Sequence, residues 1–231
     1  MTFSPCALGR CDGSGFLVDD ETRTAVPCGC RTQLVSRRRA GSLSAVIPKR
    51  YKEVGFDRNP VTAMPEPVLR PIRAYVRKID ENLDQGRGLW LFGEVGTGKT
   101  TLAMLVAKAA LDAGRSVAIY SMPRLLNEIR RTYDDGSDSS YLALFDRLAA
   151  VDLLHIDDVG AERSSPWVLE QLYSIVNARY EAERSMTITT NLDLEPLAEQ
   201  IGDRTVSRLK EMCEAIPIHG TDHRAALEHS A

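Results

Sequence analysis

The chain has 231 residues, 43% of them hydrophobic and 26% charged, with a formal net charge of −3 at pH 7. This length supports one full hydrophobic core with a small appendage, and the composition is ordinary for a soluble globular protein. The slightly acidic balance excludes bulk electrostatic binding of nucleic acid, so any such contact has to be local. Because no stretch reaches the length of a membrane span and the N-terminus lacks the order of a signal peptide, we expect a cytoplasmic protein with reduced thiols and no membrane contact.

Four of the five cysteines lie within the first thirty residues, at Cys6, Cys11, Cys28 and Cys30. A strand-like segment at 16–18, a polar turn at 19–22 and an apolar pair at 25–26 lie between them, which predicts a β-hairpin with a cysteine pair at each base. Such a segment is too short to bury a core, so a zinc ion bound by the four thiolates would supply folding free energy on the order of 10 kcal/mol. The C-x₄-C and C-x-C spacings depart from the usual C-x₂-C pairs, and free cysteines or a disulfide pair are the alternatives. Cys213 is expected to be a packing residue.

Every side chain between residues 31 and 52 that is charged at neutral pH is basic, namely Arg31, Arg37, Arg38, Arg39, Lys49, Arg50 and Lys52. This stretch is expected to be a linker that is either simply solvated or in contact with nucleic acid or an acidic partner. A proline-rich loop is expected next, marked by Pro60, Pro65, Pro67 and Pro71. Helical spacing from Ile72 to Leu83 then leads up to the first strand of the main domain.

An apolar strand at 89–92 is followed by a glycine-rich turn and a helix, and Gly93–Thr100 fits the phosphate-binding pattern G-x-x-x-x-G-K-[ST]. Glycines allow the backbone N–H groups to approach a triphosphate, and the helix N-terminus adds partial positive charge. Lys99 would reach the β- and γ-phosphates, and the Thr100 hydroxyl would ligate Mg²⁺. The predicted nucleotide-binding residues are Gly93, Glu94, Val95, Gly96, Thr97, Gly98, Lys99, Thr100 and Thr101.

The rest of the chain alternates between strand and helix patterns. Further strands are expected at 117–120, 151–156, 186–190 and 215–218, and helices at 99–111, 123–133, 141–149, 166–183, 195–201 and 203–213. This alternation predicts an α/β fold whose parallel, five-stranded sheet is covered on both faces.

Polar side chains follow two of these strands. Asp157 and Asp158 end an apolar strand, where Asp157 would hold Mg²⁺ through water and Asp158 would polarise the attacking water. An ordinary Asp-Asp turn is the alternative, and His155, one residue inside the strand, is expected to be structural. Asn191 ends the next strand at the same edge, where ligands collect in open α/β sheets. It is expected to sense the γ-phosphate, with a helix cap as the alternative.

Arg204 and Arg208 lie four residues apart in a predicted helix, which puts them on one face. Arg224 follows the last predicted strand. An arginine that reaches the γ-phosphate bound to a neighbouring subunit can raise the rate of hydrolysis by a factor of about 10³ to 10⁵. Surface ion pairs are the alternative for these side chains.

Six segments follow one another along the chain: GEVGTGKT (93–100), LLHIDDVGAE (153–162), NARY (177–180), TITTNL (187–192), GDRTVSRL (202–209) and GTDHR (220–224). Together they resemble the AAA+ ATPases of the DnaC/DnaI and IstB group, which are bacterial and phage helicase loaders and transposase helpers. The resemblance runs from about residue 47 to residue 224. The cysteine-rich start is similar to the zinc-bearing N-terminal domain of some loaders in that group.

This resemblance implies an AAA+ P-loop NTPase with ATP and Mg²⁺ as cofactors and a strand order of 5-1-4-3-2, numbered along the chain. The implied roles are Walker A for Lys99 and Thr100, Walker B for Asp157 and Asp158, sensor 1 for Asn191, trans-acting arginine finger for Arg208 with Arg204 as the alternative, and sensor 2 for Arg224. Many AAA+ proteins have Glu where this chain has the shorter Asp158, so slow turnover is expected. Because the chain ends shortly after Arg224, no full lid domain is expected.

The resemblance also implies nucleotide-dependent self-association and binding of single-stranded DNA along an inner face. The candidate DNA surface consists of Arg124, Arg130, Arg131, Tyr133, Ser165 and Trp167. An exposed aromatic side chain there would stack on a base for roughly 1–3 kcal/mol. The alternative is that Tyr133 and Trp167 pack in the core or at a subunit interface.

Two domains are therefore expected, a zinc-binding module with its basic linker over 1–45 and an AAA+ ATPase domain over 46–231. The leading hypothesis is an ATP-dependent replication protein of a bacterium or phage that loads a replicative, DnaB-type hexameric helicase onto single-stranded DNA. Its slow ATP hydrolysis would be stimulated by DNA or partner. A transposition helper of the IstB kind is the closest alternative, although such helpers usually start with a helical module. The third hypothesis is an adaptor that binds ATP and DNA but hydrolyses ATP at a negligible rate.

Overall fold

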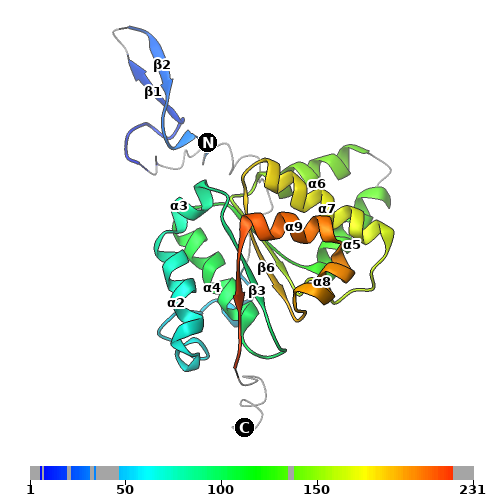
Figure 1. The fold of residues 1–231 in the computed structure, drawn as a ribbon. Coiled ribbons are helices and arrows are strands. Elements are labelled where there is room, and N and C mark those ends of the chain that lie inside the picture. Colours follow the sequence, from blue (N-terminus) through cyan, green and yellow to red (C-terminus); the bar gives the residue numbers. More distant parts are fainter. Residues whose placement is uncertain are drawn as a thin grey trace.

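The computed structural model describes residues 6, 8–19, 22–31, 34, 47–134 and 138–220. Near the start of the chain, β1 (Phe16–Asp19) and β2 (Thr24–Pro27) form an antiparallel hairpin in which Phe16 is opposite Pro27. The predicted hairpin is thus confirmed. Figure 1 shows it in blue, beside the α/β part of the chain.

A five-stranded parallel sheet forms the centre of the main domain. Its strands are β3 (Gly88–Phe92), β4 (Val117–Ser121), β5 (Leu153–Asp157), β6 (Ser185–Thr190) and β7 (Cys213–Pro217). They lie side by side in the order β4-β5-β6-β3-β7, and every neighbouring pair is parallel. Read from the other edge this is the predicted order 5-1-4-3-2, so the expected fold class is confirmed.

Helices cover both faces of this sheet (Figure 1). One layer consists of α2 (Glu66–Arg77), α3 (Ile79–Asp84) and α4 (Lys99–Asp112). The other consists of α5 (Met122–Asp134), α6 (Asp138–Ala150), α7 (Pro166–Glu181), α8 (Leu194–Ile201) and α9 (Asp203–Met212). Strand β3 shows the alternation, because Leu89 and Leu91 pack with the first layer and Trp90 with the second. In the described part of the chain, no helix combines the length and apolar character that a membrane crossing requires.

The helical segment before the first strand differs from the prediction of one helix over 72–83, because it consists of two helices, α2 and α3, with a break at Lys78. Helix α2 starts at Glu66 rather than at residue 72, and Pro67 lies in its first turn, where the proline ring fits and no N–H is needed. Pro71 lies inside the helix, where it removes one hydrogen bond. The buried face of α2, with Val68, Leu69, Ile72 and Tyr75, outweighs that loss because its side chains enter the core. At the other end of the domain, β7 starts at Cys213, directly after α9, rather than at residue 215.

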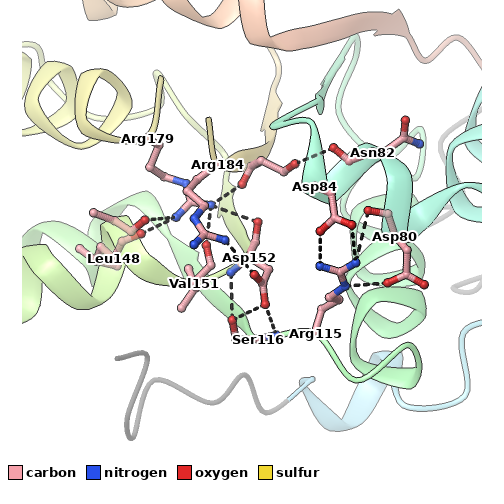
Figure 2. A network of polar contacts seen from close by, with 12 residues as sticks. Asp80, Asn82, Asp84, Arg115, Ser116, Leu148, Val151, Asp152, Arg179 and Arg184 are labelled. Atoms are coloured by element: carbon pink, nitrogen blue, oxygen red, sulfur yellow. Dashed lines mark hydrogen bonds and ion pairs between the residues drawn. The ribbon is translucent and has the colours of Figure 1, made fainter. Parts of the chain in front are cut away.

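Arg179 anchors α7 to the amino-terminal edge of the sheet (Figure 2). Its completely buried guanidinium donates hydrogen bonds to five backbone carbonyls, those of Leu148, Ala149, Val151, Asp152 and Ser185. These carbonyls belong to the end of α6, to the two residues that precede β5 and to the first residue of β6, so one side chain joins three parts of the domain. Burial lowers the pKa of Arg179 to about 9, which leaves the group charged at neutral pH.

A second buried arginine at the same edge connects the other helical layer. Arg115, just before β4, donates hydrogen bonds of 2.6 Å to the carboxylates of Asp80 and Asp84, which lie on α3 (Figure 2). Ion pairs with a buried guanidinium hold elements in register because leaving the charge unpaired costs several kcal/mol, on the order of 3–5. The amino-terminal edge is thus held by charged groups, while the carboxyl edge carries the loops with the predicted site residues.

Candidate functional site

The glycine-rich loop at 93–98 connects β3 to α4 and is tied to the end of β7. The Ile218 N–H donates a hydrogen bond of 2.7 Å to the Phe92 carbonyl. A Cβ atom on Gly93 would lie only 2.4 Å from the Ile218 carbonyl oxygen, so no larger residue fits at this position. Gly98 has a φ of 94° immediately before α4, a conformation that favours glycine. The loop therefore has the backbone that its sequence pattern predicts.

Lys99 lies inside this loop at the N-terminus of α4. Its ammonium group donates hydrogen bonds of 2.7 Å to the Gly93 carbonyl and 2.6 Å to the Glu94 carbonyl, and the residue is only 6% exposed. The Thr97 hydroxyl donates to the same Glu94 carbonyl at 2.9 Å. Positive charge, backbone N–H groups and a helix N-terminus are thus combined at one point, which is the arrangement that binds phosphate.

The first of the two predicted acids accepts hydrogen bonds from two hydroxyl groups on one of its oxygens, Oδ1. Asp157, the last residue of β5, accepts hydrogen bonds from the Thr100 hydroxyl at 2.9 Å and the Thr189 hydroxyl at 2.6 Å. Thr189 also accepts the Asp158 N–H at 2.8 Å, so one side chain fixes both acids. Sequence reasoning missed this role of Thr189, whose only signal is its position near the carboxyl end of β6.

The surroundings of Asp157 favour its ionised form. Burial by itself would raise the pKa of Asp157, but hydrogen bonding and charge from His155 and the hydroxyls of Thr189 and Thr100 lower it. His155 is completely buried; its Nδ1 lies 3.0 Å from the Thr187 carbonyl, and its Nε2 lies 3.6 Å from Asp157 Oδ1. Because a carbonyl only accepts, Nδ1 carries a proton. His155 is therefore packed inside the sheet beside the carboxylate.

Asp158 has a left-handed backbone, with a φ of 63°, which is uncommon for a residue other than glycine. Its carboxylate accepts a hydrogen bond of 2.9 Å from the side-chain amide of Asn191. The N-cap position of α8 is occupied by Asp193. The alternative in which Asn191 caps that helix is therefore wrong, and Asn191 instead orients the second acid.

A cleft of about 840 Å³ lies where these groups meet. Its lining includes Val95, Gly96, Gly98, Lys99, Thr100, Thr101, Asp157, Asp158, Thr189 and Asn191. A segment that sequence reasoning assigned to the linker and the proline-rich loop lines it too, through Arg50, Tyr51, Glu53, Val54, Arg58, Asn59, Pro60 and Ala63. This segment contains only two short 3₁₀ helices, η1 (Lys49–Tyr51) and η2 (Val61–Ala63), and so has no periodic pattern to reveal it. Within the described residues, the cleft is a suitable size for a small ligand such as a nucleotide.

The donor groups in this cleft fit a magnesium nucleotide. The Thr100 hydroxyl and the Asp157 carboxylate lie within one hydrogen bond of each other and are the hard oxygen ligands that Mg²⁺ prefers. Both lie beside the lysine and the N-terminus of α4, where a phosphate would bind. The same two residues are the predicted magnesium ligands.

The four N-terminal cysteines lie close together at the base of the hairpin. All four sulfur atoms are within 4.8 Å of one another, with 3.9 Å between Cys6 and Cys28 and 3.5 Å between Cys11 and Cys30. Zinc with four thiolates at about 2.3 Å in a tetrahedron keeps its sulfur atoms about 3.8 Å apart. The Cys11 backbone N–H is the main cause that lowers the pKa of the Cys6 thiol to about 6, whereas burial raises the pKa of Cys30. The cluster thus fits a zinc site, and its sulfur atoms are too far apart for disulfides.

The three predicted arginines are not brought together. Arg208, on α9, lies with its Cζ atom 4.2 Å from the ring centroid of Tyr180, on α7. Arg204 is exposed one turn earlier on the same helix. Neither belongs to the residues that line the cleft. Arg224, the predicted sensor 2, lies outside the described residues.

The candidate DNA surface is only partly assembled. The Arg130 guanidinium lies 4.7 Å from the Trp167 ring, and Trp167 is half-buried against the core, as its packing alternative expected. Arg124 and Arg131 are exposed on the same helix as Arg130. The Ser165 hydroxyl accepts the Val168 N–H at 3.3 Å and so caps α7. The exposed part of this surface is therefore the basic face of α5.

Comparison with known proteins identifies the relatives of this chain. Residues 79–231 match the family model described as IstB-like ATP binding protein. The chain is 28% identical over 144 residues to the replicative helicase loader DnaC of Buchnera aphidicola subsp. Schizaphis graminum, over 62% of this chain and 57% of that protein. It is 29% identical over 143 residues to the replicative helicase loader DnaC of Escherichia coli K12, over 62% and 56%. The chain thus spans just over half the length of the curated relatives it matches.

Solved structures give a consistent result. A crystal structure of the DnaC helicase loader superposes with a TM-score of 0.65 and 30% identity, over 74% of this chain and all of that one. A crystal structure of DnaI superposes with a TM-score of 0.57 and 22% identity, over 81% and 94%, which is a likeness of fold. The family match spans the phosphate-binding loop, both acids, Asn191 and α9. With most of its length matched by that model, the chain belongs to the IstB-like ATP-binding proteins, a family of AAA+ ATPases that includes DnaC.

Proposed function

We propose that this protein is an ATP-dependent loader that binds a replicative, DnaB-type hexameric helicase and places it on single-stranded DNA. One observation carries the proposal: the hydrogen-bonded cluster of Thr100, Asp157, Thr189, Asp158 and Asn191 beside a phosphate-binding loop. The named curated relatives of the chain, which are replicative helicase loaders, support the choice of client.

In the proposed reaction the loop N–H groups and Lys99 bind the triphosphate. Thr100 and Asp157 would hold Mg²⁺, which neutralises charge on the β- and γ-phosphates when it is bound. Asp158 orients the attacking water and accepts its proton, while the amide of Asn191 keeps the Asp158 carboxylate in one orientation. Arg208 of a neighbouring subunit completes the site, so hydrolysis depends on assembly.

The short reach of Asp158 supports slow turnover. Aspartate is one methylene shorter than the glutamate of many AAA+ proteins, and a misplacement of about 1 Å can cost roughly 10²-fold in rate. Because hydrolysis is then the slow step, the site holds mainly ATP when ATP is saturating. The bound state would then be the one that grips helicase and DNA, and hydrolysis would release them.

Steady-state ATPase measurements test the assignment of the nucleotide site. We expect slow hydrolysis that single-stranded DNA or helicase stimulates, and loss of hydrolysis in Lys99→Ala. The exposed arginines of α5 should account for the DNA effect, so Arg131→Ala should reduce stimulation by DNA without changing the basal rate. Wild-type hydrolysis by Lys99→Ala would overturn the assignment of the site. Negligible turnover under all conditions would instead favour the adaptor.

Co-elution with the replicative helicase in ATP tests the client. The hairpin exposes Val18 and Val26, at 67% and 57%, one on each of its two faces, so replacing both alters whichever face contacts a partner. We expect the full chain to co-elute, and the variant with Val18→Glu and Val26→Glu to lose binding. Leu142→Glu on α6 is the matched control, because this leucine is 59% exposed and lies outside the hairpin. Failure of the full chain to bind the helicase would contradict the proposal.

A transposition helper is the second candidate, because the matching family model is described as IstB-like. Both candidates use the same nucleotide site, so ATPase activity does not separate them. The N-terminal cysteine hairpin favours the loader. Binding of a transposase, with no binding of the helicase, would decide for the helper.

A further inference from the structure

Tyr173 and Tyr180 lie beside the Arg208 guanidinium where α7 and α9 pack together. The Cζ atom of Arg208 lies 4.2 Å from the centroid of the Tyr180 ring, within the range of a cation–π contact. The Tyr180 hydroxyl donates a hydrogen bond of 2.5 Å to Glu211, one turn after Arg208 on α9. Burial by itself would lower the pKa of Arg208, but the neighbouring Tyr173 and Tyr180 raise it. The arginine is thus held by its own subunit.

The Tyr180 ring, on which Arg208 stacks, belongs to a part of α7 that is anchored to the sheet. The residue before Tyr180 is Arg179, whose guanidinium binds five carbonyls at the amino-terminal edge of the sheet (Figure 2). Successive side chains on a helix point about 100° apart, so Arg179 enters the sheet while Tyr180 turns to α9. Adjacent residues of α7 therefore connect the strands of the nucleotide site to the arginine of α9.

Arg204 provides a contrast on the same helix face. It is exposed, and within the described residues its side chain has no hydrogen bond, ion pair or ring contact. Four freely rotating bonds leave such a side chain in many conformations, whereas stacking restricts Arg208 to few. A stack occupies the flat face of the guanidinium, so N–H groups in its plane stay available for a phosphate.

We propose that Tyr180, fixed by Glu211, is a positioning residue that holds Arg208 in the conformation in which it reaches the γ-phosphate bound to the neighbouring subunit. This inference rests on the proposed function, in which Arg208 acts in trans. It also assigns the role of arginine finger to Arg208 rather than to Arg204, because only Arg208 is ordered before the subunits meet. Tyr180 does not touch the nucleotide and acts through the arginine.

The test compares kcat and KM for ATP in Tyr180→Ala, Tyr180→Phe, Glu211→Gln and Arg208→Ala. An exposed cation–π contact corresponds to about a two- to fivefold change in rate. We expect Tyr180→Ala to lose about that much kcat with KM unchanged, and Tyr180→Phe and Glu211→Gln to lose less, because the ring stays. The control is Tyr120→Phe, which also removes a tyrosine hydroxyl bound to a glutamate, here Glu128 at 3.3 Å. It should leave kcat unchanged.

Mixed assemblies separate positioning from damage to the fold. A Lys99→Ala subunit cannot use ATP but carries an intact Arg208 and Tyr180, so mixing it with Tyr180→Ala should restore hydrolysis at the sites of the latter. Damage to the variant's own nucleotide site would not be restored in this way.

The outcomes distinguish this inference from the proposed function. If Arg208→Ala hydrolyses at the wild-type rate, the trans role of Arg208 fails and the inference fails with it. If Arg208→Ala is slow but Tyr180→Ala matches the wild type, the inference alone is overturned. Faster hydrolysis by Tyr180→Ala would also overturn it, because the ring would then restrain the arginine rather than position it. If Tyr180→Ala does not fold, the kcat values of Tyr180→Phe and Glu211→Gln are compared with that of the control Tyr120→Phe. Values equal to that of the control would overturn the inference.

Discussion

Thr189→Val tests the candidate site most directly, because both acids depend on the Thr189 hydroxyl. This buried hydroxyl donates a hydrogen bond of 2.6 Å to the Asp157 carboxylate and accepts one of 2.8 Å from the Asp158 N–H. Valine has nearly the same volume and fits a strand, so the substitution removes two hydrogen bonds while the packing stays almost unchanged. Any large effect therefore reports the loss of these bonds.

The size of the effect follows from the two bonds. A hydrogen bond to a carboxylate contributes about 1.5–3 kcal/mol and a neutral one about 0.5–1.5 kcal/mol. Water compensates part of the lost hydrogen bond to the Asp157 carboxylate, because the Asp157 side chain is 24% exposed. We expect a loss of about 2–3 kcal/mol in the free energy of unfolding, which corresponds to a fall in Tm of about 4–12 °C for a chain of this size. The pKa of Asp157 should rise, because Thr189 is one of the groups that lower it.

The matched control is Thr187→Val, two residues earlier on the same strand and face. Thr187 is completely buried, and its hydroxyl has no hydrogen-bond partner in the described part of the chain. Removing an unpaired buried hydroxyl should leave Tm unchanged or raise it. Thermal unfolding with and without Mg-ATP measures both variants, and Thr189→Val should also lose most of the rise in Tm that Mg-ATP gives the wild type. Equal Tm values for the two variants would refute the reasoning.

Three further predictions concern the zinc cluster and two buried groups. Metal analysis should find about one zinc per chain, and a chelator should make the four N-terminal thiols reactive while the main thermal transition changes little; well under one zinc would contradict the site. Arg179→Met should lower the free energy of unfolding, measured by denaturant titration, by about 3–5 kcal/mol, because it leaves buried carbonyls unpaired. The control Arg87→Met, whose arginine side chain is 50% exposed, should lower it by about 1 kcal/mol or less. Burial raises the pKa of the Cys213 thiol from 9.0 to about 12, so only the unfolded chain loses this proton above pH 9. Stability that is complete below pH 9 should therefore fall by up to about 1.4 kcal/mol per pH unit above it, and Cys213→Ala should show a shallower fall.

The sequence predicts the elements of this fold well because their signals are local. The phosphate-binding loop, the acids after β5 and the alternation of strands and helices each depend on neighbouring residues, and the structure has them in the expected order. The sequence predicts the start of α2 six residues late, because prolines are typical of loops. Pro67 is compatible with a first helical turn, and Pro71 is tolerated because the apolar face of α2 packs into the core.

The supporting groups of the site could not be predicted in the same way. Thr189 is one of several threonines in β6, and only the pairing of β6 with β5 brings its hydroxyl to both acids. Arg204 and Arg208 have equivalent spacing on α9, and only the packing of α9 on α7 gives one of them an aromatic partner. Such roles depend on tertiary contacts between distant segments, which a single sequence does not encode in its periodicity.

The path of the chain suggests how partner and nucleotide could be linked. After the hairpin, the chain passes into residues 50–63, which line the nucleotide cleft through Arg50, Tyr51 and Arg58. Any partner that binds the hairpin differently in the presence of ATP must change ATP affinity by the same factor, because linkage is reciprocal. We therefore expect saturating helicase to tighten ATP binding at least about fivefold in a fluorescence titration. The variant with Val18→Glu and Val26→Glu should show no such change while keeping its own ATP affinity. If the helicase leaves ATP affinity unchanged, the hairpin is only a tether, and this segment does not couple the two sites.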